Sequence, residues 1–369
     1  MLLSLSRRKN TNCRQEGVVQ MEQVRFAVVG LRFGCSIVSQ LQGNPFVRVS
    51  AVSDLDPAKA GEVASRYKCR ISTFEELLAD PEIDAVGLFT PPAGRSQLIR
   101  KCIESGKAVM TTKPLERDPA AALEILRFAR SRGVPVHLNA PSPLPCGELR
   151  MIDQWRERYS LGRPVAVRWE TYVHYREQPD GRWLDDPELC PVAPVFRLGI
   201  YGISELIHLM GRPETVNVFS SRLFTGRPTP DNAELAIRFA DGSLGSIFAS
   251  FCVNDGHSYP SALTVHFQNG TVKKRQYGPA FAVPRAQFDR VELELDCVCD
   301  GECIHETCTT SAEERSGAYQ WRNFAEAVRS GSPLAGEISP EDVASGIAVI
   351  DAMRRAEKSG RPEPVEISL

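Results

Sequence analysis

The sequence lacks any apolar run close to the roughly 20 residues that span a bilayer, so we expect no membrane partner. It also lacks an excess of one charge, because 44 Lys and Arg residues are balanced by 46 Asp and Glu residues. This balance gives no electrostatic reason to expect nucleic acid as a partner. We also expect no secretory signal, since the N-terminal basic residues follow a very short apolar patch, which is the wrong order. We therefore expect a cytoplasmic protein whose eleven cysteines are mostly reduced thiols.

The length and composition predict two globular domains. A chain of 369 residues with 42% hydrophobic and 24% charged residues can bury a sizeable core and more often forms two domains than one. Residues 1–22 are expected to be a disordered extension. Residues 23–145 alternate short apolar strands with single helices, which predicts a Rossmann-type doubly wound parallel sheet with helices on both faces. Ligands of such a sheet bind at the carboxyl ends of its strands.

Residues 146–369 follow a different rhythm and predict an α+β domain. They contain several strand-rich segments, two of which turn at Asp241-Gly242 and Asn269-Gly270, dipeptides typical of hairpins. Helical periodicity returns near the end of the chain. We expect a largely antiparallel sheet here, and we interpret residues 279–316 as an irregular insertion that contains cysteines.

A nucleotide-binding loop is expected after the first strand. The segment from Gly30 to Gly34 ends that strand and opens a helix, where backbone amides can bind a diphosphate. Arg32 occupies the place of the usual middle glycine, so its side chain would either pair with a phosphate or crowd the cofactor. Asp54 ends the second strand, near the spacing of about 20 residues expected for a carboxylate that binds the adenosine ribose. Leu55 follows instead of an arginine that could pair with the 2′-phosphate of NADP, so NAD is favoured and NADP stays open. The loop from Gly30 to Gly34, taken alone, also fits a tight strand-to-helix turn.

A lysine and a proline follow a buried strand in the first domain. Lys113 and Pro114 end the segment "GKAVMTTKP", whose apolar residues would place a cation at the carboxyl end of a parallel strand. Together with the strands, Asp54, the "TPP" segment that begins at Thr90 and the segment "FRLGIYGIS", this pattern resembles the glucose-fructose oxidoreductase / inositol dehydrogenase family (Gfo/Idh/MocA). The likeness runs from about Val24 to the C-terminus.

The resemblance implies a nicotinamide-dependent oxidoreductase that acts on sugars, polyols or sugar acids at a cleft between its two domains. It implies that Lys113 is catalytic, because an ammonium there can stabilise the reacting oxygen during hydride transfer, and that the bond to Pro114 is often cis. Tyr201 would move the proton, and we expect the Lys113 ammonium to bring its pKa closer to the working pH. The residues implied for cofactor binding are Gly30, Arg32, Phe33, Gly34, Asp54, Thr90, Pro91, Lys113 and Pro114.

Several site positions depart from the family pattern. Thr112 replaces the glutamate of the Glu-Lys-Pro signature, while Arg197 and Ser204 stand where the family commonly has aspartates, and Arg95 replaces a common histidine. The arginines at 95 and 197 predict a small-molecule substrate that carries a carboxylate or phosphate. The same departures leave open a catalytically degenerate NAD-binding sensor or scaffold of this fold. The resemblance also implies a homodimer or homotetramer.

Cysteines are dense in the segment from Cys297 to Cys308, which also contains His305. Thiolates and imidazole are preferred zinc ligands, yet the spacing is not a paired Cys-x2-Cys framework. The family that the chain resembles has no required metal. We therefore expect reduced thiols without a metal, and a metal-binding or redox-regulated segment stays an alternative.

Overall fold

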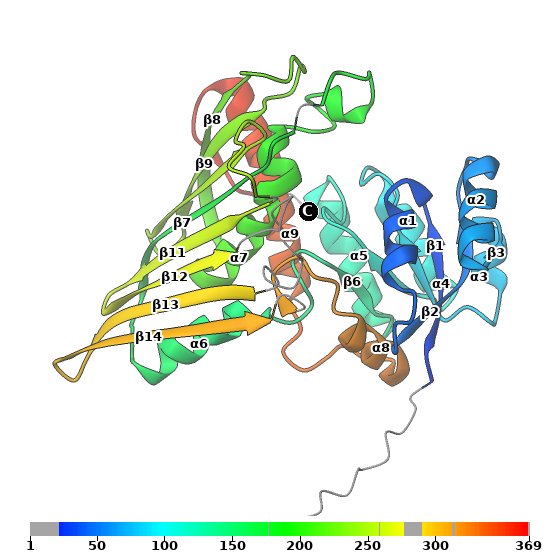
Figure 1. The fold of residues 1–369 in the computed structure, drawn as a ribbon, viewed down its shortest axis with the longest axis horizontal. Helices are drawn as coiled ribbons and strands as arrows, with labels where there is room; N and C mark the ends of the chain where they lie inside the picture. The colour runs from blue at the N-terminus through cyan, green and yellow to red at the C-terminus, as the bar shows by residue number, and fades with distance from the viewer. Residues whose placement is uncertain (1–21, 176, 258, 277–289, 312–313, 368–369) are drawn as a thin grey trace, which may run out of the picture.

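The computed structural model describes residues 22–175, 177–257, 259–276, 290–311 and 314–367, which form two domains side by side (Figure 1). Apart from Glu22, the expected N-terminal extension lies outside these residues. Within the described part of the chain, no helix is both long enough and apolar enough to cross a membrane.

The first domain is the expected doubly wound parallel sheet, with strand order β3-β2-β1-β4-β5-β6. Strands β4 and β5 are buried along their whole length because helices cover both faces. Asp56 and Asp118 begin helices α2 and α5 by accepting two backbone amides each, with a proline in the first turn. The strands are β1 (Val24–Val29), β2 (Val47–Ser53), β3 (Arg70–Ile71), β4 (Ala85–Leu88), β5 (Ala108–Thr111) and β6 (Val136–Leu138). The helices are α1 (Leu31–Gln40), α2 (Pro57–Tyr67), α3 (Phe74–Ala79), α4 (Arg95–Glu104) and α5 (Pro119–Ser131).

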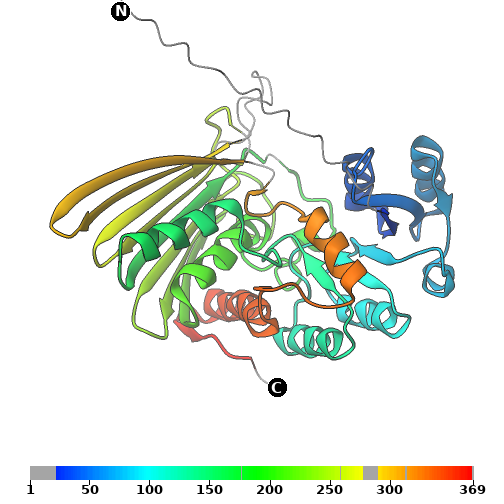
Figure 2. The same cartoon turned by 90° about the horizontal axis from the view of Figure 1, so that it is seen from below.

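The second domain is a large, mostly antiparallel sheet with the order β14-β13-β12-β11-β7-β10-β9-β8-β15, in which only the pair β7–β10 is parallel among the described strands. Helices cover one face of this sheet and leave the other open (Figure 2). The strands are β7 (Pro164–Tyr172), β8 (Pro213–Ser221), β9 (Asn232–Phe239), β10 (Leu244–Ser250), β11 (Ser261–Phe267), β12 (Gly270–Gln276), β13 (Arg290–Cys299), β14 (Glu302–Ser311) and β15 (Glu363–Pro364). The helices of this domain include α6 (Gly147–Arg158) and α7 (Ile200–Met210).

The structure corrects the expectation of an irregular insertion at residues 279–316. Residues 290–311 form the long hairpin β13–β14 at the edge of the sheet (Figure 1). Val291, Leu293 and Leu295 alternate with polar residues and are buried on one face, which is the period-two pattern of a half-buried strand. The expectation is therefore wrong for this stretch, while residues 279–289 and 312–313 lie outside the described part.

Two C-terminal helices, α8 (Trp321–Ser330) and α9 (Pro340–Ser359), belong by sequence to the expected second domain but also pack against the first. Phe324 of α8 is fully buried, and its ring lies 6.2 Å from that of Phe26 on β1, so α8 packs on the first domain. On α9, Val343 and Ile347 join the core of the first domain, whereas Met353 joins that of the second. Helix α9 thus ties the two domains together through its apolar face.

Candidate active site

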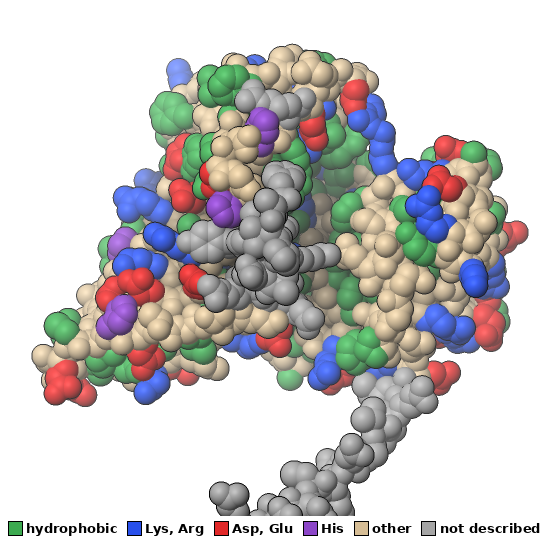
Figure 3. All heavy atoms as spheres, in the orientation of Figure 1, with side chains coloured by type: hydrophobic (Ala, Val, Ile, Leu, Met, Phe, Trp, Pro, Cys, Tyr) green, Lys and Arg blue, Asp and Glu red, His purple; other side chains and the backbone are tan. Residues whose placement is uncertain are grey.

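A cleft between the two domains gathers most of the residues that the sequence singled out. Its cavity has a volume of about 660 Å³, and the surface is hollowed between the domains (Figure 3). It lies at the carboxyl ends of β4 and β5, where a doubly wound sheet binds its ligand. The predicted residues that line it are Arg32, Phe33, Thr90, Pro91, Arg95, Lys113, Pro114, Arg197 and Tyr201.

The glycines of the phosphate loop allow close packing that no other residue would permit. Gly30 has a φ of 86°, and a Cβ there would lie 3.0 Å from the carbonyl carbon and oxygen of Phe89. A Cβ on Gly34 would lie 2.8 Å from Cγ1 of Val28. The loop therefore presses directly against the ends of β1 and β4.

The N-terminus of α1 is open toward the cleft. The helix begins at Leu31, and Arg32 and Phe33 are both exposed and both line the cavity. The Leu31 amide donates to Asp54, and the Gly34 amide donates to the Gly30 carbonyl. The amides of Arg32 and Phe33 are left, and together with the helix dipole they suit a diphosphate. Arg32 adds a cation beside them. The residues present thus fit the diphosphate of NAD.

Asp54 and Thr90 flank this helix end. The Asp54 carboxylate accepts the Leu31 amide at 2.6 Å and the Asp56 amide at 2.9 Å, and each of its oxygens keeps a lone pair for a further donor. It can therefore hold the loop and also accept a ribose hydroxyl. Thr90 lies just after β4, and its buried Oγ1 has no hydrogen-bond partner among the described residues. Pro91 follows it at the cleft.

Lys113 reaches from the first domain to the second. Its peptide bond to Pro114 is cis, as the resemblance implied. The Nζ atom donates a hydrogen bond to the carbonyl oxygen of Arg197 and lies 4.9 Å from the centroid of the Tyr201 ring. Burial, with a smaller contribution from the Arg197 cation, lowers the pKa of Lys113 to about 7. An amine in this position can change its protonation state near neutral pH.

Tyr201 is the second residue of helix α7, and the structure contradicts one expectation about it. Burial raises the pKa of its phenol to about 12, while the hydrogen bond from Asn139 lowers it by a smaller amount. The Lys113 ammonium lies over the ring. The Tyr201 hydroxyl accepts a hydrogen bond of 3.3 Å from Asn139 Nδ2. Tyr201 is therefore a neutral phenol at neutral pH, and its hydroxyl proton is available for a hydrogen bond.

Arg95 braces the loop that carries Lys113 and does not offer a free cation to a substrate. Its side chain is 2% exposed, and its terminal nitrogens donate to the carbonyl oxygens of Thr90, Thr112 (2.7 Å) and Pro114 (2.6 Å). The predicted role in substrate binding is corrected accordingly, because only Nε is left without a partner among the described residues.

The Arg197 guanidinium is also paired within the protein. Its guanidinium forms a two-pronged ion pair with Glu177, at 2.7 and 3.1 Å. It stacks on the rings of Tyr175 and Phe251, both at 4.8 Å. The predicted binding of a substrate anion by Arg197 is therefore not favoured, since its charge is already matched.

A buried amide that no sequence motif indicated lies at the centre of the site. Asn139 is 4% exposed and follows β6; its Oδ1 accepts the Lys113 amide at 3.0 Å, and its Nδ2 donates to Tyr201 and to the Gly317 carbonyl. It thereby links the lysine loop, the tyrosine and a segment from the far end of the chain. A polar residue at the carboxyl end of a parallel strand was the signal that could have identified it.

Aromatic side chains on the second-domain side of the cleft were missed as well. They come from a strand, two short helical segments and loops, so no local motif joins them in the sequence. They are Trp169, Tyr175, Trp183, Phe196 and Tyr259.

The β13–β14 hairpin separates the cysteines of the dense segment. Cys297 is buried and pairs with Ile304, whereas Cys303 is exposed and pairs with Val298, so these two face opposite sides of the sheet. The four sulfur atoms therefore do not converge on one point.

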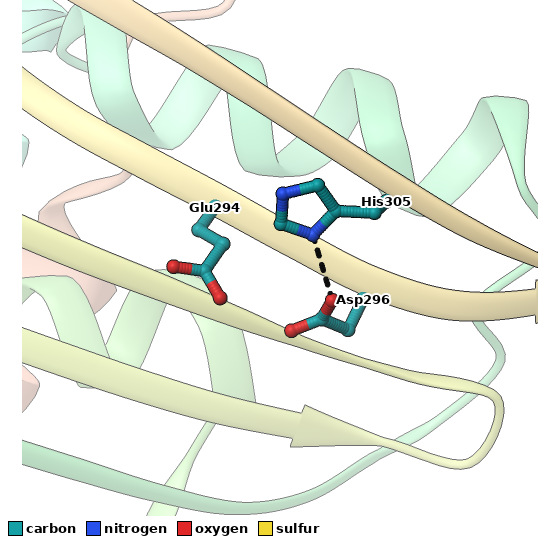
Figure 4. Close-up of side chains that lie close together, drawn as sticks. All are labelled: Glu294, Asp296 and His305. Atoms are coloured by element: carbon teal, nitrogen blue, oxygen red, sulfur yellow. Dashed lines mark hydrogen bonds and ion pairs between the residues drawn. The ribbon is translucent and has the colours of Figure 1, made fainter.

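The open face of the same hairpin carries Glu294, Asp296 and His305, whose donor atoms lie close together (Figure 4). Lys273 pairs with Glu294 at 2.7 Å and with Asp296 at 3.4 Å, while His305 and Asp296 are 2.8 Å apart. This group is explained as an exposed ion-pair network, and it contains no cysteine.

Comparison with known proteins agrees with this architecture. Residues 24–140 match the oxidoreductase family with an NAD-binding Rossmann fold, and residues 149–273 match the GFO/IDH/MocA C-terminal domain. A dTDP-3,4-didehydro-2,6-dideoxy-alpha-D-glucose 3-reductase from Saccharopolyspora spinosa is 34% identical over 85% of this chain and 90% of its own length. An uncharacterized oxidoreductase from Synechocystis is 30% identical over 42% of this chain, and the match spans only 43% of that relative.

A solved structure has the same fold across both domains. A putative NADPH-dependent oxidoreductase from Desulfitobacterium hafniense superposes with a TM-score of 0.77 over 94% of this chain and 98% of that one. Its sequence is 18% identical, so the likeness concerns the fold.

Proposed function

The chain belongs to the GFO/IDH/MocA family of oxidoreductases, and we propose that it is an NAD-dependent enzyme that interconverts a hydroxyl and a carbonyl group on a sugar-like substrate. When bound, NAD accepts or donates the hydride of this reaction. The binding residues are those around the N-terminus of α1, with Gly30, Arg32, Phe33 and Gly34 at the diphosphate and Asp54 at the ribose. Thr90, Pro91, Lys113 and Pro114 complete the cofactor side of the cleft.

One observation carries the proposal: Lys113 extends from the first domain into a cavity shared with the second, next to Tyr201. An ammonium has three donors, so Lys113 can keep its bond to the Arg197 carbonyl and also bind the reacting oxygen. It stabilises negative charge as that charge develops on the oxygen.

Tyr201 supplies the proton in this proposal. A phenol whose pKa is raised to about 12 stays protonated at neutral pH, and its hydroxyl can hydrogen-bond the oxygen of a carbonyl substrate. Asn139 orients both groups, because it binds the Lys113 amide through one atom and the Tyr201 hydroxyl through another. Arg95 fixes the loop that carries Lys113 by donating to the carbonyl oxygens of Thr112 and Pro114.

The aromatic wall supports a sugar-like substrate. The C–H faces of a pyranose or cyclitol ring are apolar and pack well on aromatic rings, while polar groups at a few points fix the orientation. Of the five aromatic residues that line the cavity on the second-domain side, Tyr175, Trp183 and Tyr259 are at least partly exposed and offer such a surface, whereas Trp169 and Phe196 are buried. Curated relatives named for reductases of dTDP-sugars and for inositol dehydrogenases point in the same direction.

A non-catalytic NAD-binding sensor or scaffold is the competing idea, and it is less well supported. Such a protein would have no need to keep a lysine, a phenol and an orienting amide within one cavity.

The resemblance also implies a homodimer or homotetramer, for which the exposed Phe219 and Leu244 on the open face of the sheet are candidate contacts. Sedimentation equilibrium would measure that state directly.

The proposed function is tested in two steps. Thermal shift with NAD measures cofactor binding, and absorbance at 340 nm then measures turnover across sugars, polyols, sugar acids and nucleoside-diphosphate sugars. Stabilisation by NAD together with turnover of one class supports the enzyme. Stabilisation without any turnover supports the sensor, and the absence of both rejects the proposal.

A further inference from the structure

Most of the cationic side chains that line the cleft already interact with other groups of the protein. Arg95 binds backbone carbonyls, Arg197 pairs with Glu177, and Lys113 lies against the Arg197 carbonyl and the Tyr201 ring. Arg32 stands beside the phosphate loop, where a diphosphate would neutralise it. One lining cation is thus left to explain.

Arg315 is that cation. It lies in the segment between β14 and α8 and lines the cleft from the second-domain side. No acidic side chain or carbonyl oxygen among the described residues accepts its guanidinium. The acidic residue found in the described lining is Glu205, and Lys274 pairs with it at 2.5 Å. The net charge of the cleft is therefore positive, and Arg315 is the lining cation that no acidic side chain of the described residues neutralises.

The segment that carries Arg315 is anchored beside the proposed catalytic residues. The Ser316 amide donates to the buried Glu148 carboxylate at 2.8 Å, and the Gly317 carbonyl accepts from Asn139 at 3.2 Å. Gly317 also packs so closely on Tyr201 that a Cβ would lie 2.7 Å from the ring. These anchors hold Arg315 in place beside Tyr201.

A second donor without an acceptor lines the same cavity. Trp169 is 3% exposed, and its indole Nε1 is buried with no hydrogen-bond partner among the described residues. Guanidinium and indole N–H groups can only donate hydrogen bonds. A substrate group that only accepts, such as a carboxylate or a phosphate ester, is the chemical complement of both.

We propose that Arg315 binds an anionic oxygen group of the substrate and so selects acidic sugars or sugar phosphates over neutral sugars. This inference rests on the proposed function and transfers the anion-binding role from Arg95 and Arg197 to a residue outside the motifs. A planar guanidinium is suited to two-pronged binding of either anion, so the shared chemistry is an anionic oxygen pair.

The test compares matched substrates in Arg315→Gln, Arg315→Lys and a control, Arg48→Gln, which changes an exposed arginine on β2. The substrates are glucose, glucuronate, glucose 6-phosphate and a nucleoside-diphosphate sugar. For the acidic substrate that the wild type uses, Arg315→Gln raises KM by about 10- to 100-fold, since a charged hydrogen bond is lost. The KM of the neutral sugar, the affinity for NAD and the control variant stay unchanged, and Arg315→Lys retains part of the selectivity.

The anion class that loses most affinity distinguishes a carboxylate from a phosphate. Equal KM increases for neutral and acidic sugars, weaker binding of NAD, or turnover of neutral sugars alone would each overturn the proposal. Thermal shift by the acidic compounds supplies a readout that needs no turnover. If the wild type turns over none of the panel, the proposed function fails, while stabilisation by an acid that Arg315→Gln abolishes still supports the anion site.

Discussion

The ammonium nitrogen of Lys113 lies 4.9 Å from the centroid of the Tyr201 ring, although the two residues belong to different domains. The same nitrogen donates to the Arg197 carbonyl, and Asn139 contacts the backbone of Lys113 and the hydroxyl of Tyr201. Relative movement of the domains would separate these groups, so helix α9, which packs into both cores, helps to keep them together.

Replacing Lys113 by methionine tests its role in catalysis. The variant keeps an unbranched apolar side chain of similar length and loses the ammonium, so we expect kcat to fall by about 10²- to 10³-fold while NAD binding persists. Steady-state kinetics and NAD thermal shift measure the two effects. Lys101→Met, which changes an exposed lysine of α4, is the matched control. Unchanged turnover in Lys113→Met would remove this residue from the mechanism.

The pH dependence of carbonyl reduction should follow Lys113. Its pKa is about 7, so the ammonium is present below that pH and is lost above it. We expect kcat/KM for reduction to fall as the pH rises through about 7. Stability should change in the opposite direction: the unfolded chain, with a lysine pKa of 10.5, binds more protons between about 7 and 10.5, so stability rises with pH there. Lys113→Arg, which stays charged, should lose the descending limb of the activity profile.

Tyr201→Phe tests the phenol without removing the ring. The ring packs against Gly317, so we expect little change in thermal stability, whereas kcat should fall by about 10²- to 10⁴-fold because the proton donor is lost. Since the phenol has a pKa of about 12, its removal should leave the limb near neutral pH in place. A pH profile of the residual activity checks this, and disappearance of that limb would assign it to Tyr201.

Much of the architecture was predictable because its signals are local. Alternating strands and helices, the glycines around Gly30 and the turns at Asp241-Gly242 and Asn269-Gly270 each depend on neighbouring residues alone. The domain against which α8 packs was not predictable in the same way. Its periodicity indicates an apolar face, but the burial of Phe324 against Phe26 depends on how distant parts of the chain meet.

The candidate site shows the same division. The position of Lys113 after a buried strand, and the cis bond that follows it, agree with what the sequence and its resemblance implied. The occupation of Arg95 by carbonyls and of Arg197 by Glu177 could not be read from residue types, because a free and a paired arginine look alike in a sequence. Arg315 was overlooked for the converse reason: it belongs to no motif.

A buried charge cluster below the cleft gives a prediction about stability. Lys274 is 1% exposed and lies 2.5 Å from Glu205 and 4.0 Å from Glu148, both of which are also buried. Lys274→Met leaves two buried carboxylates without a cation, so we expect a loss of about 3–5 kcal/mol in the free energy of unfolding, measured by urea denaturation. Burial raises the pKa of Glu205, so the loss should be smaller at acidic pH, where the Glu205 carboxyl is neutral.

The neighbouring residue on the same strand supplies the control for this stability prediction. Lys273 points to the open face, is about half exposed and pairs with Glu294, so Lys273→Met should cost only about 0–1 kcal/mol. Adding Glu205→Gln to Lys274→Met should restore part of the stability, because one of the two uncompensated charges is removed. Equal losses in Lys273→Met and Lys274→Met would show that burial of the ammonium does not govern its contribution, since the two changes differ chiefly in the face of β12 that they alter.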